Sequence, residues 1–590
     1  MQASRLALVA LLAAAPVTQL HSQSPSLDSL DAFIKAQMAR RQVNGLSLAI
    51  IQDGKIAVAR GYGVTDRTTR APVTPNTLFQ AGSISKPVAA MGALHLVEAG
   101  RLVLDEDVNT RLKSWKLPEN AFTVTEKVTL RRILSHSGGL TVHGFPGYDV
   151  NQPRPTLVQV LNGTRPANTD SIRVDTTPGT IWRYSGGGFT IMQQLVIDVT
   201  GKPFPLYMQE TVLGPIGMSN SSYDQPQPPA RAARTANGYY TDRTPVRGRW
   251  HVYPEMAAAG LWTTASDLAR FVIEVQETLA GHGHGVISPA MARQYLTVQK
   301  DDYGLGIGLA GTGPALRFSH GGRDEGFDAW MEGTAESGQG VVIMINGNDN
   351  ANVVDRIARY VAAAYHWPAT GAAAEPAARK GIHQDPARLR SLAGYYEVVE
   401  NQMVILASRD DGTGLSALID GLPGEDFLAL DSLHFGSSDR NLRIAFVQAS
   451  PGAAPLLVWR EGEPRERRAP RVVPLPSSRS PVTDPDPALT TRLTAVVAAL
   501  QQGGQVLADA PDVSPGAKKD FRDGVRGQLD ELGPLAYLGE EDVSGRGIHR
   551  HGEEVARVRY YKTTLKGEPG YLLFHLRADG KLADYDTGTR

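Results

Sequence analysis

The chain has 590 residues, of which 42% are hydrophobic and 21% are charged. One hydrophobic core does not keep growing to this length, so the sequence predicts several globular domains. Its 60 basic and 61 acidic residues give a net charge of −1, so no overall field favours nucleic acid or an anionic membrane surface. Cysteine is absent, which excludes disulfides, thiolate metal sites and a cysteine nucleophile.

The first 24 residues have the pattern of a secretory signal peptide. Arg5 precedes an apolar run from Leu6 to Val17, and a polar stretch follows. The run is too short to span a bilayer, so we expect cleavage near Leu20 to Ser24 and a secreted or periplasmic protein. The alternative is an N-terminal extension that stays on a cytoplasmic protein. No later stretch is typical of a membrane span, and we expect no integral membrane association.

Composition divides the rest of the chain into three domains and two linkers. Residues 27–367 alternate helical and strand patterns, and residues 368–386 follow as a linker with few large apolar side chains. Residues 387–462 contain short strand-like runs, which predict a small antiparallel barrel or sandwich. Residues 463–487 are rich in Pro, Arg and Ser and predict a second linker. Residues 488–590 combine a helical pattern with hairpin strands, which predicts a small α+β domain.

The first domain has strand patterns at both ends. The runs LSLAII and KIAVARGYG flank residues 52–54, a combination typical of a β-hairpin. Four more strand-like runs lie between residues 302 and 347, before a helix predicted from Asn352 to Tyr365. We therefore expect an α/β (α+β) domain in which one sheet takes strands from both ends, with a helical block inserted between them.

Ser83 and Lys86 form a Ser-x-x-Lys motif that occurs once in the chain. Ser83 follows a glycine and opens an apolar helical pattern, so both side chains lie on one helix face. A serine hydroxyl needs a base to accept its proton, and a lysine shielded from water can have a pKa low enough to serve. The N–H groups at a helix start can stabilise negative charge on an acyl carbonyl. The alternative is a serine that caps the helix beside a solvated lysine.

Two further motifs follow in order, Tyr184-Ser185-Gly186 and His320-Gly321-Gly322. With the Ser-x-x-Lys motif they resemble the serine β-lactamase and penicillin-binding-protein superfamily, in the branch of class C β-lactamases, DD-carboxypeptidases, D-aminopeptidases and esterases. The resemblance covers most of residues 27–367. It implies a β-lactamase/DD-peptidase-like fold, an antiparallel sheet flanked by helices. The two C-terminal domains loosely resemble a lipocalin-like barrel and an NTF2- or cystatin-like module.

The resemblance implies a role for each motif. Ser83 would be the acylated nucleophile, Lys86 its proton acceptor and Tyr184 a second proton carrier. His320 would lie on the strand that lines the site. Taken alone, Tyr184 and His320 would be interpreted as buried side chains with local hydrogen-bond partners.

The resemblance also implies an oxyanion hole. Its N–H groups would come from the backbone of Ser83 and of Arg323, the residue just after the third motif. Gly321 and Gly322 would let a substrate approach that strand edge.

Two departures from the family pattern bear on the substrate. The second motif often ends in an asparagine that binds an acylamide group, whereas this chain has Gly186. The third motif begins with His320 where lysine is common, and a neutral histidine carries no charge for a substrate carboxylate. Both changes favour a carboxylesterase or an amide or peptide hydrolase. The alternatives are a DD-carboxypeptidase, a D-aminopeptidase, a weak β-lactamase, or a non-catalytic penicillin-binding-type sensor.

Other functional classes lack their motifs. No Gly-x-Ser-x-Gly pentapeptide is present, as an α/β-hydrolase would need. The pairs His282/His284 and His549/His551 have no Glu-x-x-His partner, and no phosphate-binding loop occurs, so we predict neither a metal nor a cofactor. The predicted partner is a small ester, amide or peptide substrate. The sequence sets no oligomeric state.

Overall fold

The computed structural model describes most of the first domain and much of the remaining chain. The described residues are 27–240, 243–348, 352–367, 381–399, 402–409, 411–419, 422–437, 442–448, 455–460, 466–472, 480–502, 510–515, 517–518, 532–544, 549–550, 553–565 and 568–588. The predicted signal peptide and residues 368–380 of the first predicted linker lie outside them. Within the described ranges, no helix is long and apolar enough to cross a membrane.

One antiparallel sheet organises the first domain. In spatial order its six strands are β2 (Lys55–Gly63), β1 (Gly45–Gln52), β10 (Gly340–Ile345), β9 (Phe327–Thr334), β8 (Arg317–Asp324) and β7 (Gly308–Ala310). β1 and β10 come from opposite ends of the domain and pair with Leu46 opposite Ile345. The prediction that one sheet takes strands from both ends is therefore confirmed.

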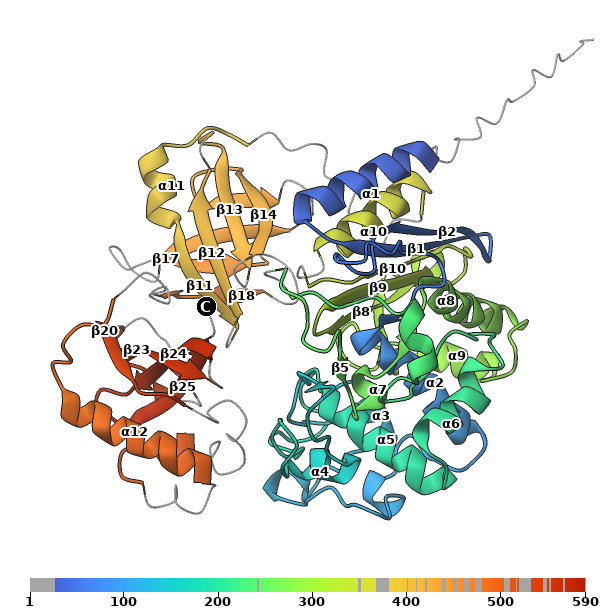
Figure 1. Cartoon of the computed structure of the whole chain (residues 1–590), viewed down its shortest axis with the longest axis horizontal. Coiled ribbons are helices and arrows are strands. Elements are labelled where there is room, and N and C mark those ends of the chain that lie inside the picture. The colour runs from blue at the N-terminus through green and yellow to red at the C-terminus, as the bar shows by residue number, and fades with distance from the viewer. Residues whose placement is uncertain are drawn as a thin grey trace, which may run out of the picture.

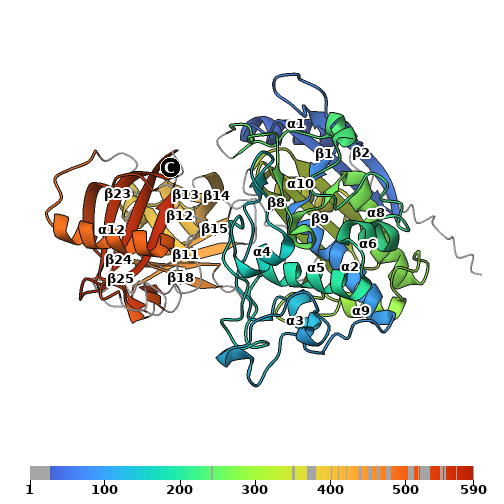
Figure 2. The same ribbon diagram turned by 60° about the horizontal axis from the view of Figure 1, so that its bottom comes forward.

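Helices cover both faces of this sheet (Figures 1 and 2). Most of them lie between β2 and β7 in the chain, as the predicted helical block. Their bounds are α1 (Leu27–Arg41), α2 (Ser85–Glu98), α3 (Leu130–Leu134), α4 (Leu157–Asn162), α5 (Gly186–Thr200), α6 (Phe204–Met208), α7 (Met256–Ala259), α8 (Ala265–Ala280), α9 (Pro289–Tyr295) and α10 (Asn352–Ala364). Two short strand pairs join parts of the block, β3 (Phe79–Gln80) with β6 (Trp262–Thr263) and β4 (Tyr148–Asp149) with β5 (His251–Val252).

The side chains of β1 show how the layers form. Successive side chains of a strand point to opposite faces. Leu46, Leu48 and Ile50 therefore pack in one core with α1 and α10, whereas Ala49 and Ile51 belong to a larger core that includes α2, α5 and α8. Figure 1 shows α1 and α10 together on the side of the sheet away from the helical block. The domain thus has three layers, with the sheet in the middle.

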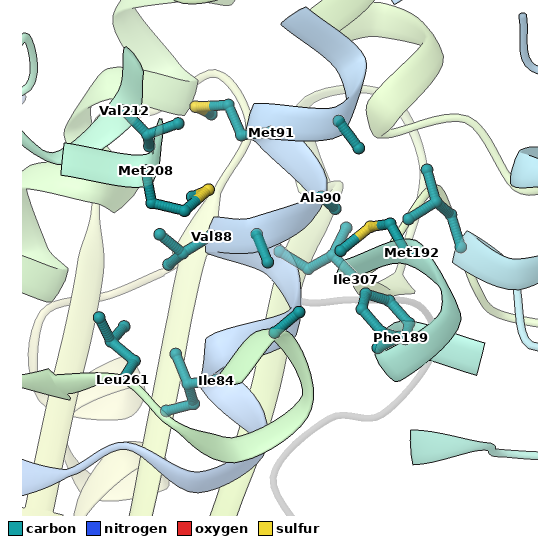
Figure 3. Close-up of a cluster of buried hydrophobic side chains, with 14 of the residues drawn as sticks. Ile84, Val88, Ala90, Met91, Phe189, Met192, Met208, Val212, Leu261 and Ile307 are labelled. Carbon is teal, nitrogen blue, oxygen red and sulfur yellow. The ribbon is translucent and has the colours of Figure 1, made fainter. Parts of the chain in front are cut away.

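Helix α2 runs through the larger core (Figure 3). Val88, Met91 and Leu94 are fully buried, and the apolar side chains of neighbouring helices contact the helix on several sides. Gly92 allows α6 to approach, because a Cβ at Gly92 would lie 2.8 Å from the Sδ atom of Met208. A helix that is apolar on all sides is typical of a domain centre. The start of α2 is therefore held firmly in place.

A nearly closed β-barrel follows the first domain. Its strands, in spatial order, are β18 (Arg467–Ala469), β17 (Pro455–Trp459), β16 (Arg443–Gln448), β15 (His434–Ser437), β14 (Leu422–Ala429), β13 (Gly414–Ile419), β12 (Gln402–Ser408), β11 (Gly394–Val399) and β19 (Arg471–Val472). Helix α11 (Pro386–Leu392) precedes them and contributes Leu389 to the barrel core. This agrees with a small antiparallel barrel, and its likeness to a lipocalin stays a prediction.

The structure corrects the boundary of the second predicted linker. Residues 463–487 were expected to connect two domains, yet β18 and β19 lie within this range. β18 pairs with β17, and β19 pairs with β11, so this segment joins the two edges of the barrel. Ala469 is fully buried whereas Arg467 and Arg468 are exposed. A strand at a barrel rim needs only one apolar face, which the abundance of Arg and Pro conceals in the sequence.

The last domain combines a helix and a sheet, as predicted. Its elements are α12 (Pro487–Gln502), the sheet strands β20 (Ala536–Asp542), β23 (Arg557–Leu565), β24 (Glu568–Leu576) and β25 (Leu582–Gly588), and the short pair β21 (His549–Arg550) and β22 (Glu553–Glu554). Leu493 and Val497 of α12 share a core with Leu572 and Phe574 of β24. The likeness of this domain to an NTF2- or cystatin-like module stays a prediction.

We expect the packing around α2 to dominate the stability of the first domain. Met91→Ala should lower its free energy of unfolding by about 2–5 kcal/mol, because it removes buried methylene groups and leaves a cavity. Val97→Ala on the same helix is the matched control, since Val97 is only half-buried and should cost less. Denaturant unfolding of both variants measures the difference. If both variants lost the same free energy of unfolding, the central position of Met91 in the core would be contradicted.

Candidate active site

Ser83 lies in the short 3-10 turn Gly82–Ile84 that leads into α2. The turn is fixed by Ser85, whose Oγ donates to the carbonyl oxygen of Gly82 (2.6 Å) and accepts from the N–H of Leu261 (2.9 Å). Gly82 and Ile84 are buried, whereas Ser83 between them is only half-buried. The turn therefore presents the Ser83 hydroxyl at an accessible point on a rigid support.

Lys86 lies one helical turn after Ser83 and is only 2% exposed. Its Nζ donates to Ser83 Oγ at 2.9 Å and to the carbonyl oxygen of Ala258 at 2.8 Å. It also lies 4.9 Å from the centre of the Tyr184 ring and 5.8 Å from that of Phe189. The side chains of Ser83 and Lys86 thus meet at hydrogen-bond distance, as predicted, although Ser83 lies in the turn before the helix and only Lys86 lies on it.

Burial sets the charge of Lys86. Loss of hydration lowers the pKa of Lys86 to about 7, although attraction to the nearby Asp324 opposes the shift. Near neutral pH a large fraction of the amine therefore carries no proton. An unprotonated Nζ at 2.9 Å from a hydroxyl oxygen can accept the hydroxyl proton.

Tyr184 reaches the same point from the helical block. It lies just before α5, where Ser185 caps the helix by accepting the N–H of Gly188 at 3.1 Å. Burial raises the pKa of the Tyr184 hydroxyl well above its ordinary value, against the effect of a hydrogen bond with Ser83. The phenol therefore keeps its proton at neutral pH and can donate a hydrogen bond next to Ser83.

His320 lies on β8, where its ring centre is 6.2 Å from that of Tyr184. Its Nδ1 is 2.5 Å from the carbonyl oxygen of Gly321, and its buried Nε2 has no hydrogen-bond partner among the described residues. Burial, together with repulsion from Lys86, lowers the pKa of His320 to about 3. The side chain is thus neutral at pH 7, and this position supplies no fixed cation.

The backbone of β8 passes close to the Ser83 turn. A Cβ at Gly322 would lie 1.9 Å from the carbonyl oxygen of Ala81, and a Cβ at Gly82 would lie 2.4 Å from the backbone nitrogen of Arg323. The backbone of Arg323 therefore lies beside the turn that holds Ser83, and the pairing of their N–H groups as an oxyanion hole stays a prediction. The Arg323 side chain points outward, with 53% exposed and its Nε 3.9 Å from a carboxylate oxygen of Asp328.

The two glycines of the third motif differ in what they do. The family resemblance implies that Gly321 and Gly322 make room for a substrate, which stays a prediction. Gly322 also allows β8 to contact the Ser83 turn, because any side chain would collide with the carbonyl oxygen of Ala81. A Cβ at Gly321 would meet the ring of Trp330 at 3.6 Å and the carbonyl oxygen of Ala329 at 4.0 Å, which are ordinary contacts. Packing within the protein therefore requires glycine at position 322 but not at position 321.

The structure adds His136 to the site. Its Nδ1 accepts the N–H of Ser185 at 3.1 Å, and its ring centre is 4.2 Å from that of Tyr184. Burial holds the pKa of His136 well below its usual range. The sequence places His136 in a Ser-His-Ser-Gly-Gly loop, which indicates a turn but not its contact with Tyr184. Trp182 and Tyr303 extend the same group of rings.

Two buried carboxyl groups that no sequence motif marks adjoin the site: Asp324 attracts Lys86 electrostatically, and Glu255 is linked to Lys86 through the backbone of Ala258. Asp324 is 4% exposed, and burial raises its pKa well above its usual range despite the attraction of Lys86. Glu255 is fully buried, and burial raises its pKa to about 8. Its carbonyl oxygen accepts the N–H of Ala258, whose own carbonyl oxygen binds Lys86. Glu255 therefore supports the Lys86 site through the backbone.

Among the described residues, no group of three or more His, Asp or Glu side chains is placed to hold a metal ion. His284, from the first histidine pair, has its Nδ1 2.5 Å from a carboxylate oxygen of the buried Glu274.

The charge state of Lys86 predicts a pH dependence for the reactivity of Ser83. The rate at which an alkyl fluorophosphonate modifies Ser83 should rise about tenfold between pH 6 and 8 and then level off, because the unprotonated amine accepts the hydroxyl proton. Mass spectrometry of the intact protein measures the rate, and Ser83→Ala provides the unlabelled control. A rate that stays flat, or that rises only above pH 9, would contradict a base with a pKa near 7.

Glu255 predicts a pH-dependent stability. Its pKa is about 8 in the folded protein against 4.5 in an unfolded chain. The folded state therefore holds a proton that the unfolded state has lost, and this stabilisation is present below pH 4.5 and is lost as the pH rises through 8. Glu255→Gln cannot ionise, so it should melt several degrees above the wild type at pH 9 and much less so at pH 5.

Differential scanning calorimetry at both pH values measures this effect. Glu119→Gln is the matched control, because the Glu119 side chain is 65% exposed and should change the melting temperature little at either pH. A Glu255→Gln variant that melts below the wild type at pH 9 would show that the carboxylate is stabilising there.

Comparison with known proteins places this geometry in a family. The Beta-lactamase family profile matches residues 30–366, more than half of the chain. A protein described as "Beta-lactamase" from Pseudomonas fluorescens is 28% identical over 246 residues, which cover 41% of this chain and 63% of that protein. "Protein flp" of Staphylococcus aureus strain MRSA252 is 25% identical over 242 residues, which cover 41% of this chain and 45% of its own length. The match thus spans less than two thirds of either relative.

A solved structure has the same fold. It is described as the octameric penicillin-binding protein homologue from Pyrococcus abyssi, with a TM-score of 0.51 and 21% identity, and the match covers 75% of this chain and all of that one. The expected β-lactamase and penicillin-binding-protein fold is therefore confirmed. The chain belongs to the beta-lactamase family, a family of serine hydrolases.

Proposed function

We propose that this protein is an exported serine hydrolase that cleaves small carboxylic esters through an acyl-enzyme on Ser83. The observation that carries the proposal is the 2.9 Å contact between Ser83 Oγ and the buried amine of Lys86, whose pKa is about 7. The N-terminal sequence pattern supports export. The proposal extends to amides and peptides, which the same site would hydrolyse by the same mechanism.

The first half of the reaction forms the acyl-enzyme. Ser83 Oγ attacks the carbonyl carbon of the ester while its proton passes to Nζ of Lys86. The carbonyl oxygen becomes an oxyanion, which the backbone N–H groups of Ser83 and Arg323 stabilise. The intermediate collapses, the bond to the alcohol oxygen breaks, and the alcohol leaves with the proton, which reaches it from Lys86 by way of Tyr184.

The second half of the reaction releases the acid. A water molecule takes the place of the alcohol, gives its proton to the same relay and attacks the acyl carbon. The bond to Ser83 Oγ then breaks, and the serine regains its proton. Because Tyr184 keeps its proton at neutral pH, it can pass protons without becoming a stable phenolate.

The uncharged walls of the site favour esters over β-lactams. His320 is neutral at pH 7, so it offers no fixed cation to a substrate carboxylate. Gly186 has no side chain to bind an acylamide group. A DD-carboxypeptidase or β-lactamase recognises such groups. A penicillin-binding-type sensor would be acylated once and stall, whereas an esterase turns over.

Side-by-side assays of p-nitrophenyl butyrate and a chromogenic cephalosporin test the proposal. The wild type should hydrolyse the ester with a kcat/KM at least ~100-fold above that for the cephalosporin, and Ser83→Ala should lower ester turnover by at least ~1,000-fold. Ser337→Ala is the matched control, because it removes a hydroxyl in the turn after β9, at the end of the sheet remote from Arg323.

Two results would overturn the proposal. Ester turnover that persists in Ser83→Ala would remove Ser83 from the reaction. Faster turnover of the cephalosporin than of the ester would show that neither Gly186 nor His320 limits β-lactam recognition.

A further inference from the structure

The segment from Thr141 to Phe145 lies against the start of α5, next to Tyr184. The N–H of Gly186 donates to the carbonyl oxygen of His143 (3.1 Å), and the N–H of Gly187 donates to that of Val142 (3.0 Å). The first residues of α5 are glycines, which lets the two backbones approach this closely. The segment is therefore a fixed part of the site.

Gly186 has no side chain because another residue fills the space. A Cβ at Gly186 would lie 3.0 Å from the ring carbon Cε2 of Phe145 and 3.1 Å from the carbonyl oxygen of His143. Gly186 begins an α-helix, so its backbone conformation is open to any residue. The aromatic ring of Phe145, which is half-buried, thus occupies the direction in which an asparagine side chain would extend.

Contacts on either side of Phe145 tie it to both walls of the site. On one side, Nδ1 of His143 is 2.6 Å from the carbonyl oxygen of Tyr184. On the other, the carbonyl oxygen of Pro146 accepts from the hydroxyl of Tyr253 at 3.5 Å. That hydroxyl also accepts the N–H of Glu325, two residues after Arg323, at 2.9 Å. Phe145 therefore lies between the Tyr184 wall and the end of β8.

The backbone of this segment is strained. Val142 has φ +63°, a left-handed conformation that is a genuine outlier for a β-branched residue. Such strain persists when the surroundings enforce it, and it clusters at functional sites. Here the hydrogen bonds to α5 and to Ser185, whose Oγ donates to the carbonyl oxygen of Thr141 at 2.8 Å, hold the strained residue in place. These hydrogen bonds therefore also hold Phe145 in a fixed position beside α5.

We propose that Phe145 determines the acyl specificity of this enzyme, selecting apolar acyl groups and rejecting those with an amide next to the reacting carbonyl. The inference rests on the proposed function of Ser83 and specifies its substrate class. An amide buried against an aromatic ring loses its hydrogen bonds to water without replacement, whereas an alkyl chain gains apolar contact.

Binding of two boronic acids of similar length tests this proposal. In each, Ser83 Oγ adds to boron, the hydroxyl proton passes to Lys86, and boron becomes tetrahedral and negatively charged. n-Butylboronic acid carries an alkyl chain, and acetamidomethylboronic acid carries an amide. Titration calorimetry on the full chain should give an n-butyl Kd at least ~10-fold below that of the acetamido compound for the wild type.

Substitutions of Phe145 then test whether this residue causes the preference for the n-butyl compound. Phe145→Ala should reduce the ratio of the two Kd values to below about 3, and Phe145→Leu should retain most of it, because leucine keeps the apolar contact. Phe145→Ala with Gly186→Asn should reverse the preference in favour of the amide. Phe122→Ala, which truncates a partly buried aromatic side chain outside the site, should leave the ratio unchanged. Tight acetamido binding by the wild type, or an unchanged ratio in Phe145→Ala, would overturn the proposal.

The outcome separates this inference from the proposed function. Ser83-dependent ester turnover with an unchanged ratio in Phe145→Ala would refute the role of Phe145 alone. Selective boronate binding without ester turnover would refute the esterase function and leave the role of Phe145 in place. Ser83→Ala should bind neither compound, and a wild type that binds neither would also refute the role of Phe145.

Discussion

An amino group that leaves water loses its hydration, and the rest of this site is arranged around that cost for Lys86. The carbonyl oxygen of Ala258 and the hydroxyl of Ser83 accept hydrogen bonds from the amine, and the rings of Tyr184 and Phe189 lie within 6 Å of it. These partners hold Nζ in position, and attraction to the buried Asp324 only partly offsets the lowering of its pKa by burial. The turn before α2, helix α7 and the start of α5 thus meet at one nitrogen atom.

The ionisable groups around Lys86 are held in their neutral forms. His320 is neutral because it is buried and because Lys86 would repel its positive form. Burial also raises the pKa values of Asp324 and Glu255, so these acids tend to keep their protons. An interior with little net charge makes each proton transfer sensitive to the others, since a new charge acts through a medium that screens it poorly.

The sequence predicts those site residues that belong to a recognisable motif. Ser83, Lys86, Tyr184 and His320 meet in space as their order in the chain suggests, and the sheet takes strands from both ends of the domain. Burial of a charged residue depends on contacts far apart in the chain, so Glu255 carried no signal.

The same limit applies to packing against glycine. A glycine shows in the sequence that a side chain is missing, but the neighbour that fills its place can come from anywhere. For Gly186 that neighbour is Phe145, and for Gly322 it is the carbonyl oxygen of Ala81. Strand β18 was hidden because only Ala469 is buried, whereas Arg467 and Arg468 are exposed.

The pairing of β1 with β10 constrains when the first domain can fold. During synthesis the β1–β2 hairpin emerges early, but β10 is not made until most of the domain has been produced. Until then β1 exposes an unpaired edge of backbone N–H and carbonyl groups. Closing the sheet joins segments far apart in the chain, which is entropically slow. The sheet of the first domain can therefore close only after β10 has been made, and a chain truncated before β10 would leave β1 with an unpaired edge.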